Sequence, residues 1–93
     1  MIKEIMEVGS SIKNGRTIQD VAIKLAEESG EVMGAITGLS SYKKINEMDL
    51  CDELADTLIN IVDLGRLTYG DEFPSLLGKS VKRKCEKWKE KYK

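Results

Sequence analysis

Residues 49–67 restrict the fold more than any other segment, because apolar side chains surround most of their helical circumference. When the segment is wound at about 100° per residue, its polar positions fall into one narrow strip. The apolar positions are Leu50, Cys51, Leu54, Ala55, Leu58, Ile59, Ile61 and Val62. The strip consists of Glu53, Asp56, Asn60 and Asp63. A helix that is apolar on most sides is a buried helix, so we expect its acids to be partly buried too.

Two helical stretches precede this segment. Residues 2–13 form the first, which ends at an Asn-Gly pair. Residues 17–38 form the second, which carries an amphipathic stripe at helical spacing. Thr17 is its expected N-cap, with Asp20 as capping-box-like partner. Gly38 is the expected C-terminal stop.

A loop over residues 39–48 is expected next, and Asp49 is the expected N-cap of the third helix. A fourth helix starts near Pro74, because proline is tolerated in a first helical turn. Its apolar face consists of Leu77, Val81, Cys85, Trp88 and Tyr92. For Trp88, a place in a core or a dimer interface is favoured over a base-stacking role.

The four stretches predict an all-α chain with one domain over residues 1–93, a four-helix bundle-like subunit. A chain this short buries only part of its surface, so we expect oligomerisation to complete its core. Gly30 and Gly34 each cost about 1 kcal/mol relative to Ala inside a helix. Their presence indicates close helix packing or close ligand approach there.

Charge is distributed unevenly along the chain. Residues 1–78 hold 7 basic and 14 acidic groups, whereas residues 79–93 hold 8 basic and 2 acidic groups. The acidic part argues against a general nucleic-acid binder, although the basic end could contact phosphates. No stretch approaches the roughly 20 apolar residues of a membrane span.

The two cysteines and the amino-terminal segment favour a cytoplasmic protein. Cys51 and Cys85 are the only cysteines, which suggests free, buried thiols in a reducing compartment. The first seven residues lack the long apolar run of a secretion signal.

A second pair of acids matches the strip of the third helix. Glu28 and Glu31 have i, i+3 spacing and lie beside the apolar stripe of the second helix, as Glu53 and Asp56 do on the third. We expect the four carboxylates to converge between the two helices, where they would require a cation. Lys24, one turn before Glu28, can offset one charge but not four. The alternative interpretation is a solvated helix face.

The chemistry of the side chains restricts the cation. The chain has no histidine, which argues against a zinc site and rules out the Glu-x-x-His pairs of di-iron bundles. Carboxylate oxygens suit Mg²⁺ or Mn²⁺. Because Mg²⁺ commonly bridges to substrate phosphates, a polyphosphate is the natural substrate of such a site.

The acids also occur in a familiar arrangement. Glu27-Glu-x-x-Glu31, followed after 21 residues by Glu53-x-x-Asp56, resembles the signature of the MazG-like nucleotide pyrophosphohydrolases, which are all-α NTP pyrophosphatases. The flanking Lys24-Leu-Ala and Thr57-Leu-Ile fit as well. The resemblance covers about residues 17–70.

This resemblance implies an enzyme that hydrolyses a nucleoside triphosphate between its α and β phosphates, yielding a monophosphate and pyrophosphate. The implied magnesium ligands are Glu28, Glu31, Glu53 and Asp56, with Mn²⁺ as a substitute. Glu27 and Glu28 are the implied catalytic residues, although Glu27 points away from the strip and a solvated position is the alternative. The implied substrate-binding residues are Lys24, Asn60, Lys79, Lys82 and Arg83. Homodimers or homotetramers are expected, with active sites bordering the subunit interfaces.

Two other functions remain open. A non-catalytic helical module for oligomerisation or regulation would have the same fold but would hydrolyse no nucleotide. A nucleic-acid-binding protein acting through residues 79–93 is disfavoured by the acidic remainder and the scarcity of aromatic residues. For Asn60, a side chain satisfied by the backbone is the alternative to a contact with sugar, base or a water on the metal.

Overall fold

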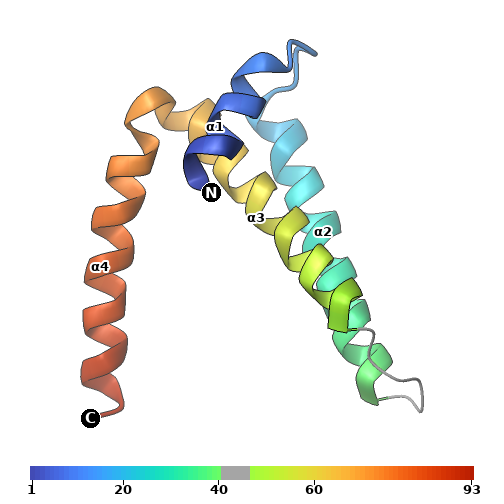
Figure 1. Cartoon of the computed structure of the whole chain (residues 1–93), viewed down its shortest axis with the longest axis vertical. Helices are drawn as coiled ribbons and strands as arrows, with labels where there is room; N and C mark the ends of the chain where they lie inside the picture. Colours follow the sequence, from blue (N-terminus) through green and yellow to red (C-terminus); the bar gives the residue numbers. More distant parts are fainter. Residues whose placement is uncertain (41–46) are drawn as a thin grey trace.

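The computed structural model describes the backbone of residues 1–40 and 47–93, and the side chains of residues 1–37 and 50–93. Within these ranges every regular element is helical (Figure 1). The elements are α1 (Ile2–Ser11), α2 (Ile18–Ser40), α3 (Glu47–Tyr69), the 3-10 helix η1 (Gly70–Glu72) and α4 (Phe73–Lys91). The prediction of an all-α chain is therefore confirmed. None of the described helices is both long and apolar enough to span a bilayer.

The start of α2 is fixed by the predicted capping box. The backbone N–H of Asp20 donates to Thr17 Oγ1 at 3.1 Å, and the backbone N–H of Thr17 donates to Asp20 Oδ2 at 2.9 Å. This reciprocal pair satisfies amide groups that a helix start otherwise leaves without partners. Pro74 occupies the first turn of α4, also as predicted.

Two predicted helix ends were wrong. The second helix passes through Gly38 and continues to Ser40, because glycine permits a left-handed stop without enforcing one. The third helix already begins at Glu47, so Asp49 lies inside it and is not its N-cap. The predicted loop is thereby shortened at both ends, and residues 41–46 lie outside the described residues.

The core lies where α1 and the start of α4 meet α3. Met6, Val62 and Phe73 are buried together, and four partly buried apolar residues pack against them. Those four are Ile2, Ile5, Leu58 and Leu77. Gly65 is essential to this junction, because a Cβ there would overlap the Phe73 ring.

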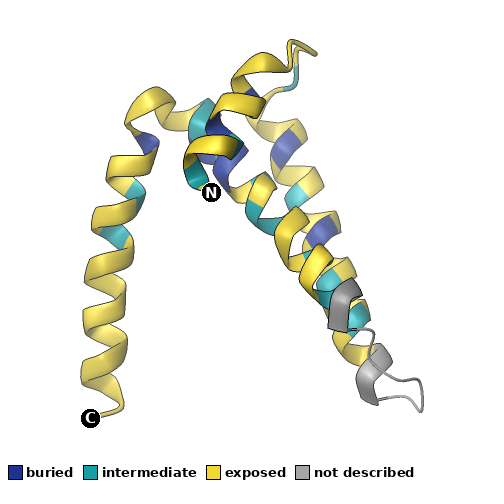
Figure 2. Cartoon of the chain, in the orientation of Figure 1, coloured by how far each residue is buried: buried dark blue, intermediate teal, exposed yellow. Residues whose placement is uncertain are grey.

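α2 packs along α3, whereas α4 diverges from α3 after their junction at η1 (Figure 1). Every residue of α4 from Val81 onward is exposed (Figure 2). The prediction that α3 is buried on most sides is consequently wrong for the single chain. Leu54 is 51% exposed and Ile59 is 47% exposed, because α2 is the one described helix that runs along this part of α3 (Figure 1).

Three further expectations of burial or close packing also fail in the single chain. The free thiols Cys51 and Cys85 are exposed rather than buried. Apart from its own helical turn, a Cβ added at Gly30 or Gly34 would meet no atom of the described residues within 4 Å, so close packing among those residues does not explain these glycines. Trp88 is 67% exposed, so it lies in no core of the single chain, and its expected alternative place in a dimer interface stays a prediction.

Candidate metal centre

Three of the predicted metal ligands come together between α2 and α3. Glu28 projects from α2, and Glu53 and Asp56 project from α3. One carboxylate oxygen from each lies within 4.8 Å of the other two. The i, i+3 spacing on α3 places Glu53 and Asp56 on the side that faces α2. Oxygens this close can bind one cation together.

Glu31, the fourth predicted ligand, lies against the same group. The pKa of its carboxyl is raised above 4.5, first because it shares a hydrogen bond with Glu53 and then because the Glu53 charge repels its own. The four acids therefore lie close together, as their spacing predicted, and their negative charges repel one another.

The acids of the cluster differ in how far their side chains are buried. The Glu28 side chain is only 7% exposed, and Glu53 is half-buried. Asp56 and Glu31 are exposed. The cluster is therefore closed on the side of Glu28 and open to solvent on the side of Asp56, where a ligand could approach.

Two buried carboxylate oxygens of the cluster lack a partner. Glu28 Oε2 and Glu53 Oε2 accept no hydrogen bond from any residue in the described part of the chain. Lys24 Nζ lies 3.4 Å from the other oxygen of Glu28, Oε1, and so offsets only part of the charge. Buried carboxylate oxygens without donors are costly, and a cation would remove that cost. The donor set, made only of carboxylates, fits Mg²⁺ or Mn²⁺.

Glu27 lies outside this group. Its side chain is 59% exposed, and its carboxylate is 3.7 Å from Lys24 Nζ on the solvent side of α2. This position matches the outward direction expected from the helical wheel.

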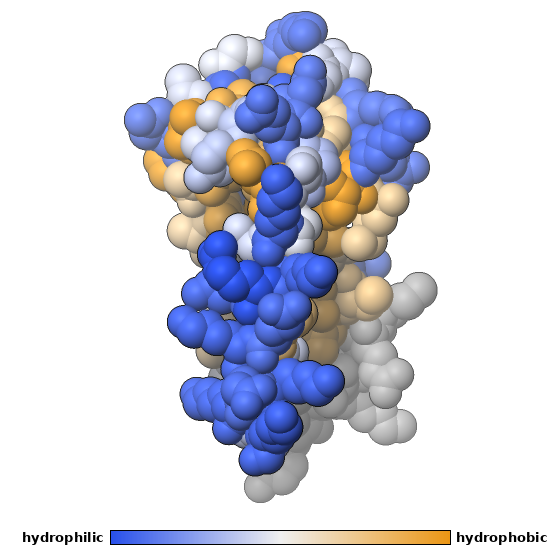
Figure 3. Space-filling model, turned by 90° about the vertical axis from the view of Figure 1, so that its left-hand side faces the viewer, coloured by the Kyte–Doolittle hydropathy of each residue, from blue (hydrophilic) through white to orange (hydrophobic). Residues whose placement is uncertain are grey.

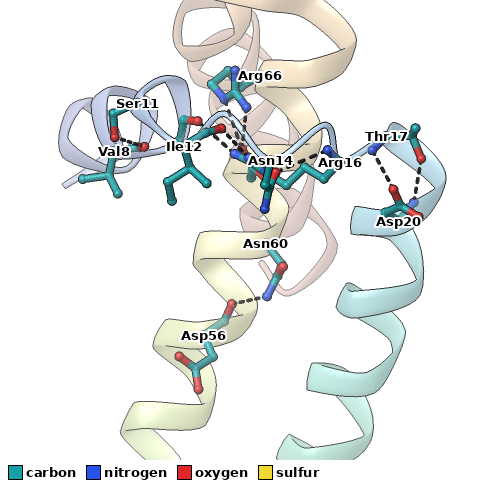
Figure 4. Close-up of polar contacts among 12 residues, drawn as sticks. Val8, Ser11, Ile12, Asn14, Arg16, Thr17, Asp20, Asp56, Asn60 and Arg66 are labelled. Carbon is teal, nitrogen blue, oxygen red and sulfur yellow. Dashed lines mark hydrogen bonds and ion pairs between the residues drawn. The ribbon is translucent and has the colours of Figure 1, made fainter.

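Asn60 lies one turn beyond Asp56 on α3. Its Nδ2 donates to the Asp56 backbone carbonyl at 2.9 Å (Figure 4), so the interpretation of an asparagine satisfied by the backbone accounts for its donor group. Its side chain also lines a pocket of about 440 Å³ between α1, α2 and α3. Lys24 lines the same pocket, which therefore adjoins the acidic cluster through two residues. The apolar wall consists of Ile5, Val8, Ile12, Val21 and Ile59.

The basic residues predicted on the last helix lie elsewhere. Lys79, Lys82 and Arg83 are exposed on α4, which diverges from the α2–α3 pair (Figure 1). Within the described residues, none of the three forms an ion pair with the cluster.

A second charged network beside the pocket was not predicted. Arg16 and Arg66 both bind the buried Asp63 carboxylate, and Arg16 also donates to the carbonyls of Gly9 and Ile12 at the end of α1 (Figure 4). Asp63 belongs to the polar strip that the sequence predicts on the third helix. The i, i+3 spacing of Asp63 and Arg66 is a sequence signal for one of its two arginine partners.

Comparisons of the chain with protein-family models, curated proteins and solved structures found no match.

Proposed function

We propose that this protein is a Mg²⁺-dependent nucleoside triphosphate pyrophosphohydrolase of the MazG-like, all-α type. The observation that carries the proposal is the pair of partnerless carboxylate oxygens, Glu28 Oε2 and Glu53 Oε2, in a cluster of acids between two helices. A structural role alone would give these oxygens hydrogen-bond donors. A solvated helix face would leave them in water.

The four acids would hold the ion together. Glu28 and Glu53 supply buried oxygens, and Asp56 and Glu31 supply exposed ones. When bound, Mg²⁺ would polarise the phosphate and support activation of the attacking water, and Mn²⁺ would substitute. The triphosphate would approach from the exposed side of the cluster, at Asp56 and Glu31.

The residues around the cluster would bind and orient the substrate. Lys24 can contact a phosphate, since its side chain is more than half exposed and already points toward Glu28. Glu27, accessible to solvent one position before Glu28, is suited to orienting a water or accepting its proton. Asn60 and the adjoining apolar pocket suit the nucleoside portion of the substrate. Water adds to the phosphoanhydride, the bond between the α and β phosphates breaks, and the nucleoside monophosphate and pyrophosphate leave.

We further propose that the protein is a cytoplasmic homodimer or homotetramer in which the helices form closed bundles. The exposed apolar residues of α3 and α4 support this, because a single chain leaves them in water.

A hydrolysis screen tests the activity. Canonical and modified NTPs and dNTPs are incubated with Mg²⁺, and pyrophosphate, orthophosphate and monophosphate are all measured. We expect pyrophosphate and monophosphate in equal amounts, and at least a hundredfold loss in Glu53→Gln and Asp56→Asn. Glu86→Gln, which removes an exposed carboxylate from α4, serves as the matched control. Full activity in both cluster variants would reject the assigned site.

A non-catalytic helical module is the second candidate, favoured by the exposure of α4 from Val81 onward. It predicts no turnover of any nucleotide and no Mg²⁺ or Mn²⁺ binding by calorimetry.

A further inference from the structure

Lys24 lies between the acidic cluster and the pocket. Its Nζ is 3.4 Å from Glu28 Oε1 and 3.7 Å from Glu27 Oε2, and its side chain also lines the pocket between α1, α2 and α3. Among the described residues, it is the one cation that forms an ion pair with an acid of the cluster. A ligand that binds at either place therefore acts on Lys24.

The ammonium of Lys24 and a divalent cation compete for Glu28. The Glu28 side chain is 7% exposed, and its Oε2 is buried without a donor, which is the observation that indicates a cation there. Its Oε1 already faces Lys24. A divalent cation on this carboxylate would lie close to the ammonium, and like charges repel strongly where little water separates them. Lys24 in its present position therefore weakens the binding of a bare metal ion.

The ion pairs of Lys24 are loose enough to break. Both distances, 3.4 and 3.7 Å, exceed the roughly 3.2 Å of an ordinary hydrogen bond, and the side chain is 56% exposed. Exposed pairs of this kind stabilise a helix only slightly. Arg16 lines the same pocket but is fixed, because its guanidinium makes five hydrogen bonds, none longer than 2.9 Å. Lys24, unlike Arg16, can change its partner at little cost.

The basic residues of α4 do not take the place of Lys24 within the chain. They gather on a strongly hydrophilic face (Figure 3), on a helix that diverges from α2 and α3 (Figure 1). Besides Lys24, the charged residues that line the pocket are three acids and Arg16, whose donors are all in use. In the described part of the chain, Lys24 is therefore the cation that an anion beside the cluster can bind.

We propose that Lys24 exchanges partners, from the Glu28 carboxylate to a phosphate of the incoming ligand, so that the divalent cation and the triphosphate bind cooperatively. This exchange rests on the proposed function, because it takes the cluster as the metal centre and a triphosphate as the ligand. A phosphate that binds Lys24 removes the ammonium from Glu28, and a cation on Glu28 releases the ammonium for the phosphate. The coupling is reciprocal. The site thereby favours the complex of metal and triphosphate over the bare metal ion.

Two measurements on the full chain test the exchange. Free Mn²⁺ is followed by electron paramagnetic resonance during titration of wild type, Lys24→Gln and Lys24→Arg. Lys3→Gln, which removes an exposed lysine of α1, is the matched control. Acetylation of Lys24 in the wild type is followed by mass spectrometry in chelator, in Mg²⁺, and in excess Mg²⁺ with inorganic tripolyphosphate as the probe.

K24Q should bind free Mn²⁺ about tenfold more tightly than the wild type, because no ammonium has to leave Glu28. K24R, which keeps the charge, and K3Q should bind Mn²⁺ as the wild type does. In the wild type, Mg²⁺ should raise the acetylation of Lys24 about threefold, because the ion pair with Glu28 no longer holds the side chain. Tripolyphosphate should reverse this increase, and the acetylation of Lys3 should not change.

Two results overturn the exchange and leave the proposed function standing. One is Mn²⁺ binding by K24Q that is no tighter than that of the wild type. The other is acetylation of Lys24 that does not respond to Mg²⁺, or is not reversed by tripolyphosphate, although the wild type binds Mn²⁺. Absence of Mn²⁺ binding by the wild type overturns the exchange and the proposed function together, so the two failures are distinguishable.

Discussion

Arg16 binds Asp63 through two parallel hydrogen bonds, from Nε to Oδ2 at 2.7 Å and from Nη2 to Oδ1 at 2.9 Å. The two residues are 47 positions apart, and both side chains are less than a fifth exposed. The remaining Arg16 donors bind the Asn14 side chain and the carbonyls of Gly9 and Ile12. One guanidinium therefore closes the end of α1 and ties the segment before α2 to α3, which positions one wall of the pocket.

Arg16→Lys should destabilise the protein by about 2 kcal/mol, because an ammonium cannot reproduce the bidentate geometry and leaves carbonyls unsatisfied. Urea denaturation measures the loss. Lys93→Gln, which removes the exposed pair with Glu90, is the control and should cost less than about 0.5 kcal/mol. Equal losses of unfolding free energy in the two variants would mean that the Arg16 network stabilises the protein no more than an exposed ion pair does.

The stabilisation by Asp63 should depend on pH. Its pKa lies below the ordinary value of 3.8, first because Arg16 donates hydrogen bonds to the carboxylate. Because the folded pKa is depressed, the contribution is fully present well above pH 3.8 and is lost as the pH falls through the lower folded value. The stability difference between wild type and Asp63→Asn should therefore shrink below about pH 3.8. A difference that stays constant down to pH 2 would contradict the role of the charge.

The acidic cluster should reduce stability when no metal is present. The pKa of Glu31 is raised, first by its hydrogen bond with Glu53 and then by repulsion from the Glu53 charge, so the close approach of these carboxylates costs free energy. Glu53→Gln should therefore raise the melting temperature in chelator. In Mg²⁺ at ten times Kd, the wild type should gain about 1.4 kcal/mol that the variant does not. A variant that is less stable than the wild type in chelator would indicate a structural role for Glu53.

Two glycines inside helices should respond oppositely to alanine. Gly65→Ala should destabilise by about 2 kcal/mol, because the Cβ collides with the Phe73 ring in the core. Gly30→Ala should stabilise by about 1 kcal/mol, because its Cβ enters open space and alanine favours the helix. Thermal unfolding of both variants shows which substitution stabilises the protein and which destabilises it. Destabilisation by Gly30→Ala would mean that another surface covers α2 there.

Local chemistry predicted several features well. The Thr17–Asp20 capping box and the position of Pro74 depend on neighbouring residues only, and both are confirmed. The spacing of the four acids predicted that they lie close together, because two helical faces with i, i+3 pairs can meet in few ways.

Features that depend on long-range packing were not predictable. The third helix was expected to be buried because its composition is apolar, but the direction of α4 leaves Leu54 half exposed. Burial depends on where the other helices go, which the periodicity of one helix does not specify. The Arg16–Asp63 pair joins residues 47 positions apart, so spacing along a helix could not reveal it.

Binding of Mn²⁺ is the most direct test of the central claim that acids on α2 and α3 form a divalent-cation centre. Free Mn²⁺ is followed by electron paramagnetic resonance during titration of wild type, Glu53→Gln and the control Glu86→Gln. We expect saturable binding to wild type and E86Q, displaced by excess Mg²⁺, and at least tenfold weaker binding to E53Q. Equal binding to all three proteins, or none to the wild type, would contradict the account.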